Sequence, residues 1–468
     1  MTLRPCASYL SDRDIDRIVD AALRILEKTG MVVESEDILS RLGDFGGKVD
    51  KGAQISRFPN AFMHAFIESS ERTRDEGKGI SFTASAEIYQ GWFLDPVDGE
   101  FKEWNTKRFL DYVHLAKALP NLDGISMLGC PLAEVPPRLQ PLYERLYCWK
   151  YGVASSGSIW ETQLCDAIVE MCEIMAEASG KAFSEIFTGA VYLISPLKFS
   201  RVEAEQFMRF QRRGIEIGVG ALGTLGGTAP VTLAGSLALQ LAEKLFIAVL
   251  KRAFFGRLAL DLGNSLSVID MSTGAMQYGR PEEIIASLAF AQIARRIGAR
   301  TGSHGGLSDA KLPGPEAASQ KVSSAVFNAL GCGRGNIAAG LLGVDEVFSP
   351  VQMILDDEAA GYLKRVAKGF EVDEESLAIN AIDETGQGGS FLESDHTVAH
   401  FIDALWMPRR WSREMLTSWR AGGSKSEIDR AREEYLGYVG SGVLMDPEIS
   451  KATENKLMEI ISRYDDLV

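Results

Sequence analysis

A glycine-rich stretch at 218–235, GVGALGTLGGTAPVTLAG, is the part of this sequence that most resembles a ligand-binding loop. Its first six letters fit G-x-G-x-x-G, the turn that holds a dinucleotide pyrophosphate at the start of a helix. That role needs the helix to begin within the glycines, but GTLGGTAP follows and postpones the helix to about Val231. Small residues would also let a flat partner approach closely, and a loop needing positive φ angles would look the same. The loop by itself leaves these alternatives open.

Three aromatic residues follow predicted strands. Trp160 follows GVASSGSI, Tyr192 lies in GAVYLISP and Phe348 lies in VDEVFSPVQ. If the strands belong to one barrel, these rings could converge on a quaternary ammonium, because π faces attract a diffuse positive charge. The alternative is that each ring packs into the core.

Histidine is scarce, with five in the chain. His304, in TGSHGGLSDAKLPG, follows a predicted strand and can reach a carboxylate or polarise a substrate. His396 and His400 are four apart on a predicted helix, which is metal-ligand spacing, but the glutamate of H-E-x-x-H is absent between them. The six cysteines form no C-x-x-C pair. We therefore predict that the chain has no metal or nucleotide of its own.

The elements that would position these residues alternate between short apolar runs and helical patterns from about residue 121 to 350. Such alternation is typical of a parallel sheet with helices on its faces. Seven strand–helix units are clear and an eighth strand is not evident. Because each strand ends in a Gly/Ser-rich loop, we predict an α/β fold built on a (β/α)8 TIM-type barrel. The predicted organisation is a helical N-terminal segment with a β-hairpin at 96–100 (1–120), the barrel (121–357) and a C-terminal helical segment packing on the barrel (358–468).

Composition narrows the class of protein. The chain has 468 residues, 46% of them hydrophobic, and a formal net charge of −15, which argues against a nucleic-acid partner. No uninterrupted apolar stretch is long enough for a transmembrane helix, and the N-terminus lacks a signal-peptide core. We therefore expect a cytoplasmic protein with no membrane partner.

Several motifs together resemble the trimethylamine:corrinoid methyltransferase superfamily. They are GGTAPVTLAGSLAL, SVIDMSTGAMQYGRPE, GGLSDAKLPGPEAASQK, VFSPVQMILDDE and GGSFLESDHTVAHFIDALWMP, and the similarity spans almost the whole chain. The resemblance implies a barrel enzyme that gives a substrate methyl group to the cobalt of a separate corrinoid protein. Archaeal trimethylamine enzymes carry pyrrolysine, whereas this chain contains only the ordinary residues. It is similar instead to the non-pyrrolysine branch, which demethylates quaternary amines such as glycine betaine, proline betaine or carnitine.

A quaternary amine fits the missing pyrrolysine, because it leaves as a neutral amine without prior activation. The enzyme then has only to aim one methyl group at the nucleophilic Co(I) and exclude water, so we assign no general base. We predict glycine betaine as the substrate; the alternatives are another methylated amine, including a tertiary one, or a quaternary-amine binding protein without catalysis.

The hypothesis assigns the residues as follows. Trp160, Tyr192 and Phe348 form the ammonium cage, His304 binds the substrate carboxylate, and Asn264 and Gln352 supply further hydrogen bonds. Gly223, Gly226, Gly227 and Thr228 face the docked corrinoid, which answers the question of the glycine-rich loop. The expected partners are a cognate corrinoid protein, a small quaternary amine and further copies of the chain in a homo-oligomer.

Overall fold

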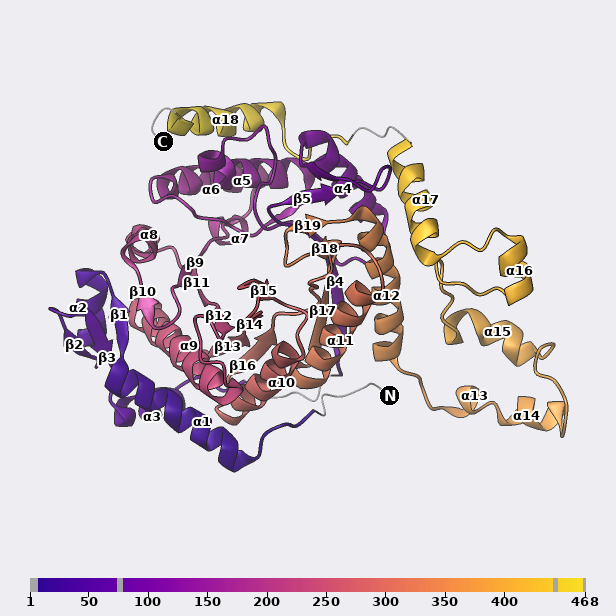
Figure 1. Ribbon diagram of the computed structural model, residues 1–468, viewed down its shortest axis with the longest axis horizontal. Helices are drawn as coiled ribbons and strands as arrows, with labels where there is room; N and C mark the ends of the chain where they lie inside the picture. Colours follow the sequence, from indigo (N-terminus) through magenta and orange to yellow (C-terminus); the bar gives the residue numbers. More distant parts are fainter. Residues whose placement is uncertain (1–6, 74–78, 441–444, 466–468) are drawn as a thin grey trace.

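The computed structural model describes residues 7–73, 79–440 and 445–465, and it is a mixed α/β structure (Figure 1). The N-terminal part contains helices around a small sheet in which β1 pairs with β3 and β10, and β3 pairs with β2. Its elements are α1 Asp12–Arg24, a π-helical turn Ile25–Thr29, β1 Met31–Val33, α2 Glu36–Asp44, β2 Lys48–Asp50, β3 Ile55–Arg57 and α3 Asn60–Glu68. Strand β10, Lys198–Phe199, comes from much later in the chain and ties this part to the rest.

The centre of the molecule is a series of strands that are each followed by a helix. The strands are β4 Ser81–Ile88, β7 Gly124–Met127, β8 Ala154–Ser155, β9 Ala190–Leu193, β11 Gly218–Ala221, β13 Asp261–Asn264, β16 Arg300–Ser303 and β17 Arg334–Ala339. The helices are α4 Thr106–Ala118, α5 Gln140–Tyr151, α6 Leu164–Ser179, α8 Arg201–Gln211, α9 Leu233–Phe255, α10 Pro281–Arg296, α11 Pro315–Cys332 and α12 Pro350–Lys368. Alternation of this kind was expected from the sequence.

The strands pair in parallel, but not as one continuous ladder. The order β17–β4–β7–β8 forms one arc, β11–β9 a second and β13–β16 a third. No ladder joins the three arcs within the described residues, so the structure does not show the closed barrel that the sequence predicts. Strand β4 is the strand that the sequence analysis could not locate: it pairs in parallel with β7 and β17 and lies ahead of residue 121, where the barrel was expected to begin.

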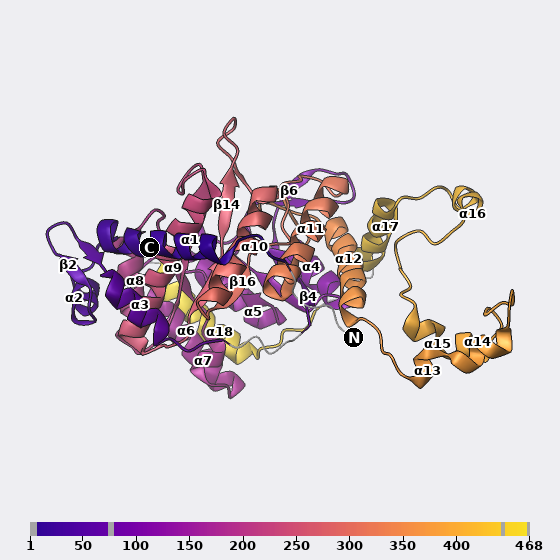
Figure 2. The same ribbon diagram turned by 90° about the horizontal axis from the view of Figure 1, so that it is seen from below.

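Short strands and helical turns lie in the loops between these longer strands and helices. They are β5 Trp92–Leu94, β6 Phe101–Glu103, the 3₁₀ turn Pro137–Leu139, α7 Phe183–Ile186, β12 Gly223–Leu225, β14 Leu266–Ile269, β15 Met276–Gln277, β18 Leu341–Leu342 and β19 Val347–Phe348. Strands β5 and β6 pair antiparallel across 95–100, where the sequence places a hairpin turn. The β14–β15 hairpin projects from the body (Figure 2).

The C-terminal part is uneven in its packing. Its helices are α13 Glu374–Leu377, α14 Ile379–Thr385, α15 Asp395–Ala404, α16 Leu416–Ala421, α17 Glu427–Gly440 and α18 Lys451–Asp465. Helix α17 packs on α12 and α4, and α18 packs on α6 and α5. The segment with α13 to α16 extends away from the body instead (Figures 1 and 2). The prediction that this whole region packs on the barrel therefore does not describe α13 to α16.

Helix α9 forms the centre of the largest hydrophobic core cluster. It is long and apolar enough to cross a membrane by length and composition, but 72% of the relevant window is buried inside the fold. Burial on this scale is what a core helix requires, because a helix that is apolar all round needs protein on every side.

Buried ion pairs anchor α12. Lys321 Nζ lies 2.7 Å from Asp356 Oδ2, and Arg410 Nη1 lies 2.7 Å from Asp357 Oδ2. Arg410 also pairs with Glu358. The three consecutive acidic residues of α12 thus hold the helix in place.

Candidate active site

Acidic and phenolic side chains converge where the parallel strands end. Glu87 is the second-last residue of β4, and Tyr89 directly follows the strand. Tyr278 follows β15, and Asp345 lies between β18 and β19. The Tyr278 hydroxyl is hydrogen bonded to the Asp345 carboxylate, which accepts the bond. Burial, and after it the charge of Asp345, raises the pKa values of both Glu87 and Tyr89. Four side chains from three separate parts of the sequence therefore share one region.

The carboxyl groups here hold their protons unusually strongly. Burial, reinforced by the charge of Asp345, raises the pKa of Glu87 to about 7, and burial raises the pKa of Asp345 to about 6. Burial and the charges of Asp309 and Asp345 also raise the pKa of Glu283. Both effects penalise the anionic form, so the region lacks sufficient positive charge to balance its carboxylates. A cationic ligand would supply that charge.

The nearest lysine does not fill this need. Lys321 lowers the pKa values of Glu87 and Asp345 by its charge, but its ammonium group is already bound. It donates to Asp356 Oδ2 and to the Ala338 carbonyl, both at 2.7 Å. Its charge is therefore largely committed to holding α12.

Several carboxylate oxygens near the strand ends are buried without a hydrogen-bond partner among the described residues. They are Asp345 Oδ1, Glu283 Oε1 and Glu144 Oε2. The other oxygen of Glu144 accepts bonds from Ser155, Ser156 and the Gly157 amide. An unsatisfied buried oxygen costs about 1–3 kcal/mol, so native proteins rarely keep one without a ligand or a functional reason. These orphaned oxygens support the view that the region binds a ligand.

The backbone that carries Asp345 is strained. Val344 has φ 59° and Asp345 has φ 69°, both in the left-handed region. A β-branched residue there is a clear outlier, and such strain costs about 1–3 kcal/mol per residue. Strain of this size persists where the surrounding structure holds it, and here the Val344 amide donates to the Ser308 carbonyl at 3.0 Å. Strained positions cluster at functional sites, which supports a role for Asp345.

His304 lies beside this group. Its imidazole packs edge-on against Tyr278, with ring centroids 5.2 Å apart, and its amide donates to the Asn264 carbonyl at 3.2 Å. Solvent reaches the side chain, yet the protein around it lowers its pKa. A lowered pKa favours the neutral imidazole at pH 7, which can still donate one N–H bond to a substrate.

Two of the three predicted cage aromatics are exposed. The Trp160 side chain is 38% exposed and Tyr192 is 59% exposed. Tyr192 lies close enough to Tyr89 for the charges of the two phenols to interact. Both rings are thus available to a ligand, and Tyr89 adds an aromatic group that the sequence analysis did not consider.

Phe348 does not join these rings. It is 2% exposed and packs against Tyr112, Trp104 and Phe93, with ring centroids 5.1, 5.4 and 6.2 Å away. A ring surrounded by three others has no face left for an ammonium group. Its expected place in the cage is therefore corrected: Phe348 is a core residue, which was the alternative interpretation.

The predicted amide ligands are buried in structural contacts. Gln352 is 2% exposed and its Nε2 donates to Asp356 Oδ1 at 2.7 Å, so it supports the buried Lys321–Asp356 ion pair. Asn264 is 3% exposed and donates to Ser287 Oγ at 2.8 Å. Gln352 Oε1 is nevertheless buried without a hydrogen-bond partner among the described residues, and the roles of both amides as substrate ligands stay predictions.

The first observable role of the glycine-rich loop is to allow its own backbone conformation and close packing. Gly226 has φ 83°, and a Cβ there would lie 3.0 Å from Ile269. Gly223 packs against Leu266, whereas Gly227 and Thr228 line a groove formed with α1 and α9. The positive φ at Gly226 matches one of the alternatives considered for this loop, and the corrinoid-facing role of the four residues stays a prediction.

The helical histidine pair lies elsewhere. His396 and His400 are on α15, with ring centroids 4.4 Å apart, and His400 Nε2 lies 3.4 Å from Glu375 Oε1. Within residues 7–73, 79–440 and 445–465, no three His, Cys, Asp or Glu side chains are grouped as metal ligands. Five of the cysteines are free thiols, and Cys6 lies outside the described residues.

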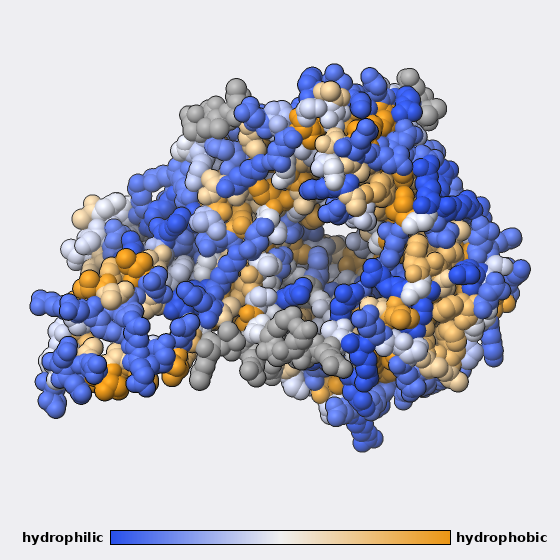
Figure 3. All heavy atoms as spheres, turned by 180° about the vertical axis from the view of Figure 1, so that it is seen from behind, coloured by the Kyte–Doolittle hydropathy of each residue, from blue (hydrophilic) through white to orange (hydrophobic). Residues whose placement is uncertain are grey.

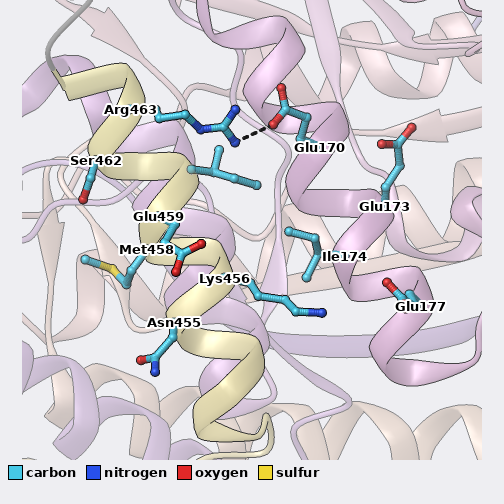
Figure 4. Close-up of a pocket in the computed structure, with 11 residues that line it drawn as sticks. Glu170, Glu173, Ile174, Glu177, Asn455, Lys456, Met458, Glu459, Ser462 and Arg463 are labelled. Carbon is cyan, nitrogen blue, oxygen red and sulfur yellow. Dashed lines mark hydrogen bonds and ion pairs between the residues drawn. The ribbon is translucent and has the colours of Figure 1, made fainter.

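The surface has hollows of different character. Figure 3 shows that the face seen from behind is hollowed near its centre. A separate groove of about 1130 Å³ runs between α6 and α18 (Figure 4). Acidic side chains dominate its walls, and Arg463 pairs there with Glu170 at 2.7 Å. None of the predicted site residues lines this groove.

Sequence reasoning missed the residues that converge most closely. Tyr89 and Glu87 lie in the EIYQ that ends β4, and finding them required recognising SFTASAEI as a barrel strand. The turn GVDEV, which carries Asp345, contains only an ordinary acidic pattern. No signal in the sequence marked its backbone strain.

Comparisons with known proteins cover the whole chain. The trimethylamine methyltransferase (MTTB) family profile matches residues 2–466. The chain is 24% identical over 449 residues to trimethylamine methyltransferase MttB of Desulfitobacterium hafniense, covering 92% of this chain and 88% of the relative. It is 25% identical over 467 residues to glycine betaine methyltransferase of the same species, covering 96% of each. The match to the solved structure of the Methanosarcina barkeri monomethylamine methyltransferase spans 95% of this chain and 96% of that chain, with 10% sequence identity and a TM-score of 0.43.

Proposed function

Because the chain belongs to the trimethylamine methyltransferase family, as its motifs predicted, we propose that it transfers a methyl group from a methylated ammonium compound to the Co(I) of a separate corrinoid protein. The observation that carries this proposal is the group of under-neutralised carboxyls formed by Glu87, Glu283 and Asp345 beside exposed aromatic rings. Carboxylates and π faces both stabilise a positive charge that is removed from water. The finer fold assignment, a closed (β/α)8 barrel with its mouth at these strand ends, is part of the proposal.

The residues of this chain would act by binding and aiming. Trp160, Tyr192 and Tyr89 face the ammonium, and Asp345, held by Tyr278, lies on the acidic side of the site. The corrinoid supplies a strong nucleophile, and the methyl group moves to it while the nitrogen keeps the electron pair of the broken C–N bond. The chain needs no proton transfer for a quaternary substrate, and its contribution is orientation and exclusion of water.

The open face suits an acceptor carried by another protein. The exposed rings of Trp160 and Tyr192 leave the strand ends accessible from outside the chain. The glycine-rich loop, through Gly223, Gly226, Gly227 and Thr228, is the predicted contact to the corrinoid. We also propose that the protein is cytoplasmic. Among the described residues, the single helix that is long and apolar enough to cross a membrane, α9, is mostly buried in the fold.

The choice of substrate divides into two candidates. Glycine betaine is favoured by the likeness to a glycine betaine methyltransferase over 96% of both chains, and its carboxylate would accept a bond from neutral His304. The surplus of carboxyl groups favours a methylated ammonium without a carboxylate, since an anionic group would meet like charges there. Both candidates share the cationic nitrogen that the site selects.

A donor panel tests the proposal. The purified full chain is mixed with chemically reduced cob(I)alamin and with glycine betaine, carnitine, proline betaine, trimethylamine or tetramethylammonium. Loss of the Co(I) absorbance with one donor, and mass detection of the methylated corrinoid and the demethylated amine, are expected. Calorimetric binding of a donor without methyl transfer to either free cobalamin or a corrinoid protein would instead indicate a binding protein.

Matched variants connect the activity to the site. D345N should lower kcat/KM by about tenfold or more, because it removes a charge that faces the cation. The neighbouring Glu346 side chain is exposed, so E346Q should leave the rate unchanged. Equal activity of both variants and the unaltered protein would contradict the placement of the site.

A further inference from the structure

Residues 369–408, here called the arm, form a segment that leaves the body and carries no buried residue. Figures 1 and 2 show it extending from the end of α12 through α13, α14 and α15. Twelve of its large apolar side chains are exposed, among them Leu392 at 84% and Ile402 at 72%. Figure 3 shows hydrophobic patches at the left of the view, on the side of the molecule from which the arm extends.

An exposed apolar surface of this size is unfavourable in water. Patches on monomeric proteins rarely exceed a few hundred Å², whereas twelve half-exposed apolar side chains present on the order of 1,000 Å². Interfaces of that size and apolar character are typical of permanent assemblies rather than of partners that bind and leave. The occupant is therefore expected to be a permanent neighbour of the chain.

The arm is held in place at its base. At its C-terminal end Arg410 is buried and pairs with Asp357 and Glu358 of α12, and the Arg409 amide donates to Glu358 Oε1 at 2.7 Å. Arg365 of α12 also donates to the Ala404 carbonyl at 2.7 Å. Because both ends return to α12, the arm cannot swing far across its own body.

Charge identifies a matching surface. Between 369 and 408 the chain has nine acidic residues and no lysine or arginine. A groove of about 730 Å³ between α1, the π-helical turn and α9 has the opposite character. Its walls include Ile25, Leu197 and Leu239, and its charged lining residues are Arg24 and Lys28. An apolar acidic segment fits an apolar groove with a basic rim.

The groove and the arm lie at opposite ends of the molecule (Figure 1). We propose that the arm of one chain packs into the groove of a second copy of this chain. Each copy then offers one arm and one groove, which gives a reciprocal pair or a closed ring. Gly227 and Thr228 line the same groove, so in this assembly they would contact the second copy and not the corrinoid. The proposed methyl transfer itself does not depend on these two residues.

Complementary variants test the assembly. The full chain, at micromolar concentration, is analysed by size-exclusion chromatography with light scattering. The wild type should be one defined oligomer. L392D/I402D on the arm and R24E/K28E in the groove should each weaken association by about 100-fold, whereas V97D, at a residue that is 70% exposed on the β5–β6 hairpin, should keep the wild-type mass.

Mixing the two variants gives the decisive result. Each keeps the surface that the other has lost, so an equimolar mixture should regain a complex that neither forms alone. All substituted side chains are exposed, and unchanged melting temperatures will show that the variants fold. A monomeric wild type, an arm variant of wild-type mass, or a mixture that stays monomeric would each overturn the proposal.

A second measurement needs no variant. Hydrogen exchange of the wild type should show protected amides in α15 of the arm, because the interface covers them. Rapid exchange there in the oligomer would overturn the proposal, as would an arm that becomes protected only when a corrinoid protein is added.

Discussion

The ring of Tyr192 lies directly against the backbone of Gly220 on the neighbouring strand. The two residues are paired in the register of β9 and β11, and a Cβ added to Gly220 would lie 2.5 Å from Tyr192 Cε1. The second glycine of GVGALG thus makes room for an aromatic ring, which no pyrophosphate-binding pattern requires. The position of the exposed phenol depends on the smallest residue beside it.

G220A should therefore displace Tyr192. We expect a rise in the Kd for a quaternary ammonium of about tenfold, because an aromatic contact to a cation contributes about 1–2 kcal/mol. Calorimetry with tetramethylammonium measures it. G263A in β13 is the control, since its Cβ would meet only an ordinary contact at 3.5 Å. Unchanged affinity in G220A would show that the Tyr192 ring does not contact the ammonium ligand.

Trp160 and Phe348 should respond differently to truncation. W160A is expected to weaken ammonium binding by tens of fold at an almost unchanged melting temperature, since the side chain is partly exposed and a desolvated cation–π contact is worth about 2 kcal/mol. F348A should instead lose about 3–5 kcal/mol of folding stability, because it leaves a cavity among three rings. Denaturant unfolding and calorimetry on both variants measure the contrast, and a stable F348A with weaker binding would return Phe348 to the cage.

The raised pKa values of Glu87 and Asp345 predict a pH-dependent stability. Between their ordinary pKa values, 4.5 for Glu87 and 3.8 for Asp345, and the folded values of about 7 and about 6, the folded state binds more protons than the unfolded chain. The ligand-free protein should therefore lose stability, on the order of 4–5 kcal/mol, as pH rises from about 4.5 to 7. Calorimetric melting across this range measures the loss.

The same carboxyls connect pH with ligand binding. E87Q and D345N should flatten the stability profile, and a cationic ligand should stabilise the wild type more at pH 7 than at pH 5, because it favours the ionised forms. Ligand stabilisation that is equal at both pH values would show that these groups do not face the cation.

The buried ion pair of Lys321 should be structural. K321M leaves Asp356 without its counter-charge at a fully buried position, so a loss of about 3–5 kcal/mol is expected. The double variant K321M/D356N should recover part of that loss, because the orphaned charge is gone. Urea denaturation gives both values, and a double variant less stable than K321M would contradict the pairwise account.

Much of the fold follows from local patterns that the sequence displays directly. Ser11 directly precedes α1 and caps it, because its hydroxyl accepts from the Asp14 amide at 3.2 Å. Strand–helix alternation and the motifs of the family are likewise local, since each depends on residues that are neighbours in the chain. For this reason the α/β class and the family were predictable.

The membership of the site was decided by tertiary structure. Glu87, Tyr278 and Asp345 come from three separate parts of the chain, and the parallel pairing of β4 with β7 and β17 brings Glu87 to the other two. Burial and like charge then set their pKa values, and neither can be seen in one-dimensional order. Phe348 shows the reverse case: three distant rings surround it, so a residue that looked like a ligand became part of the core.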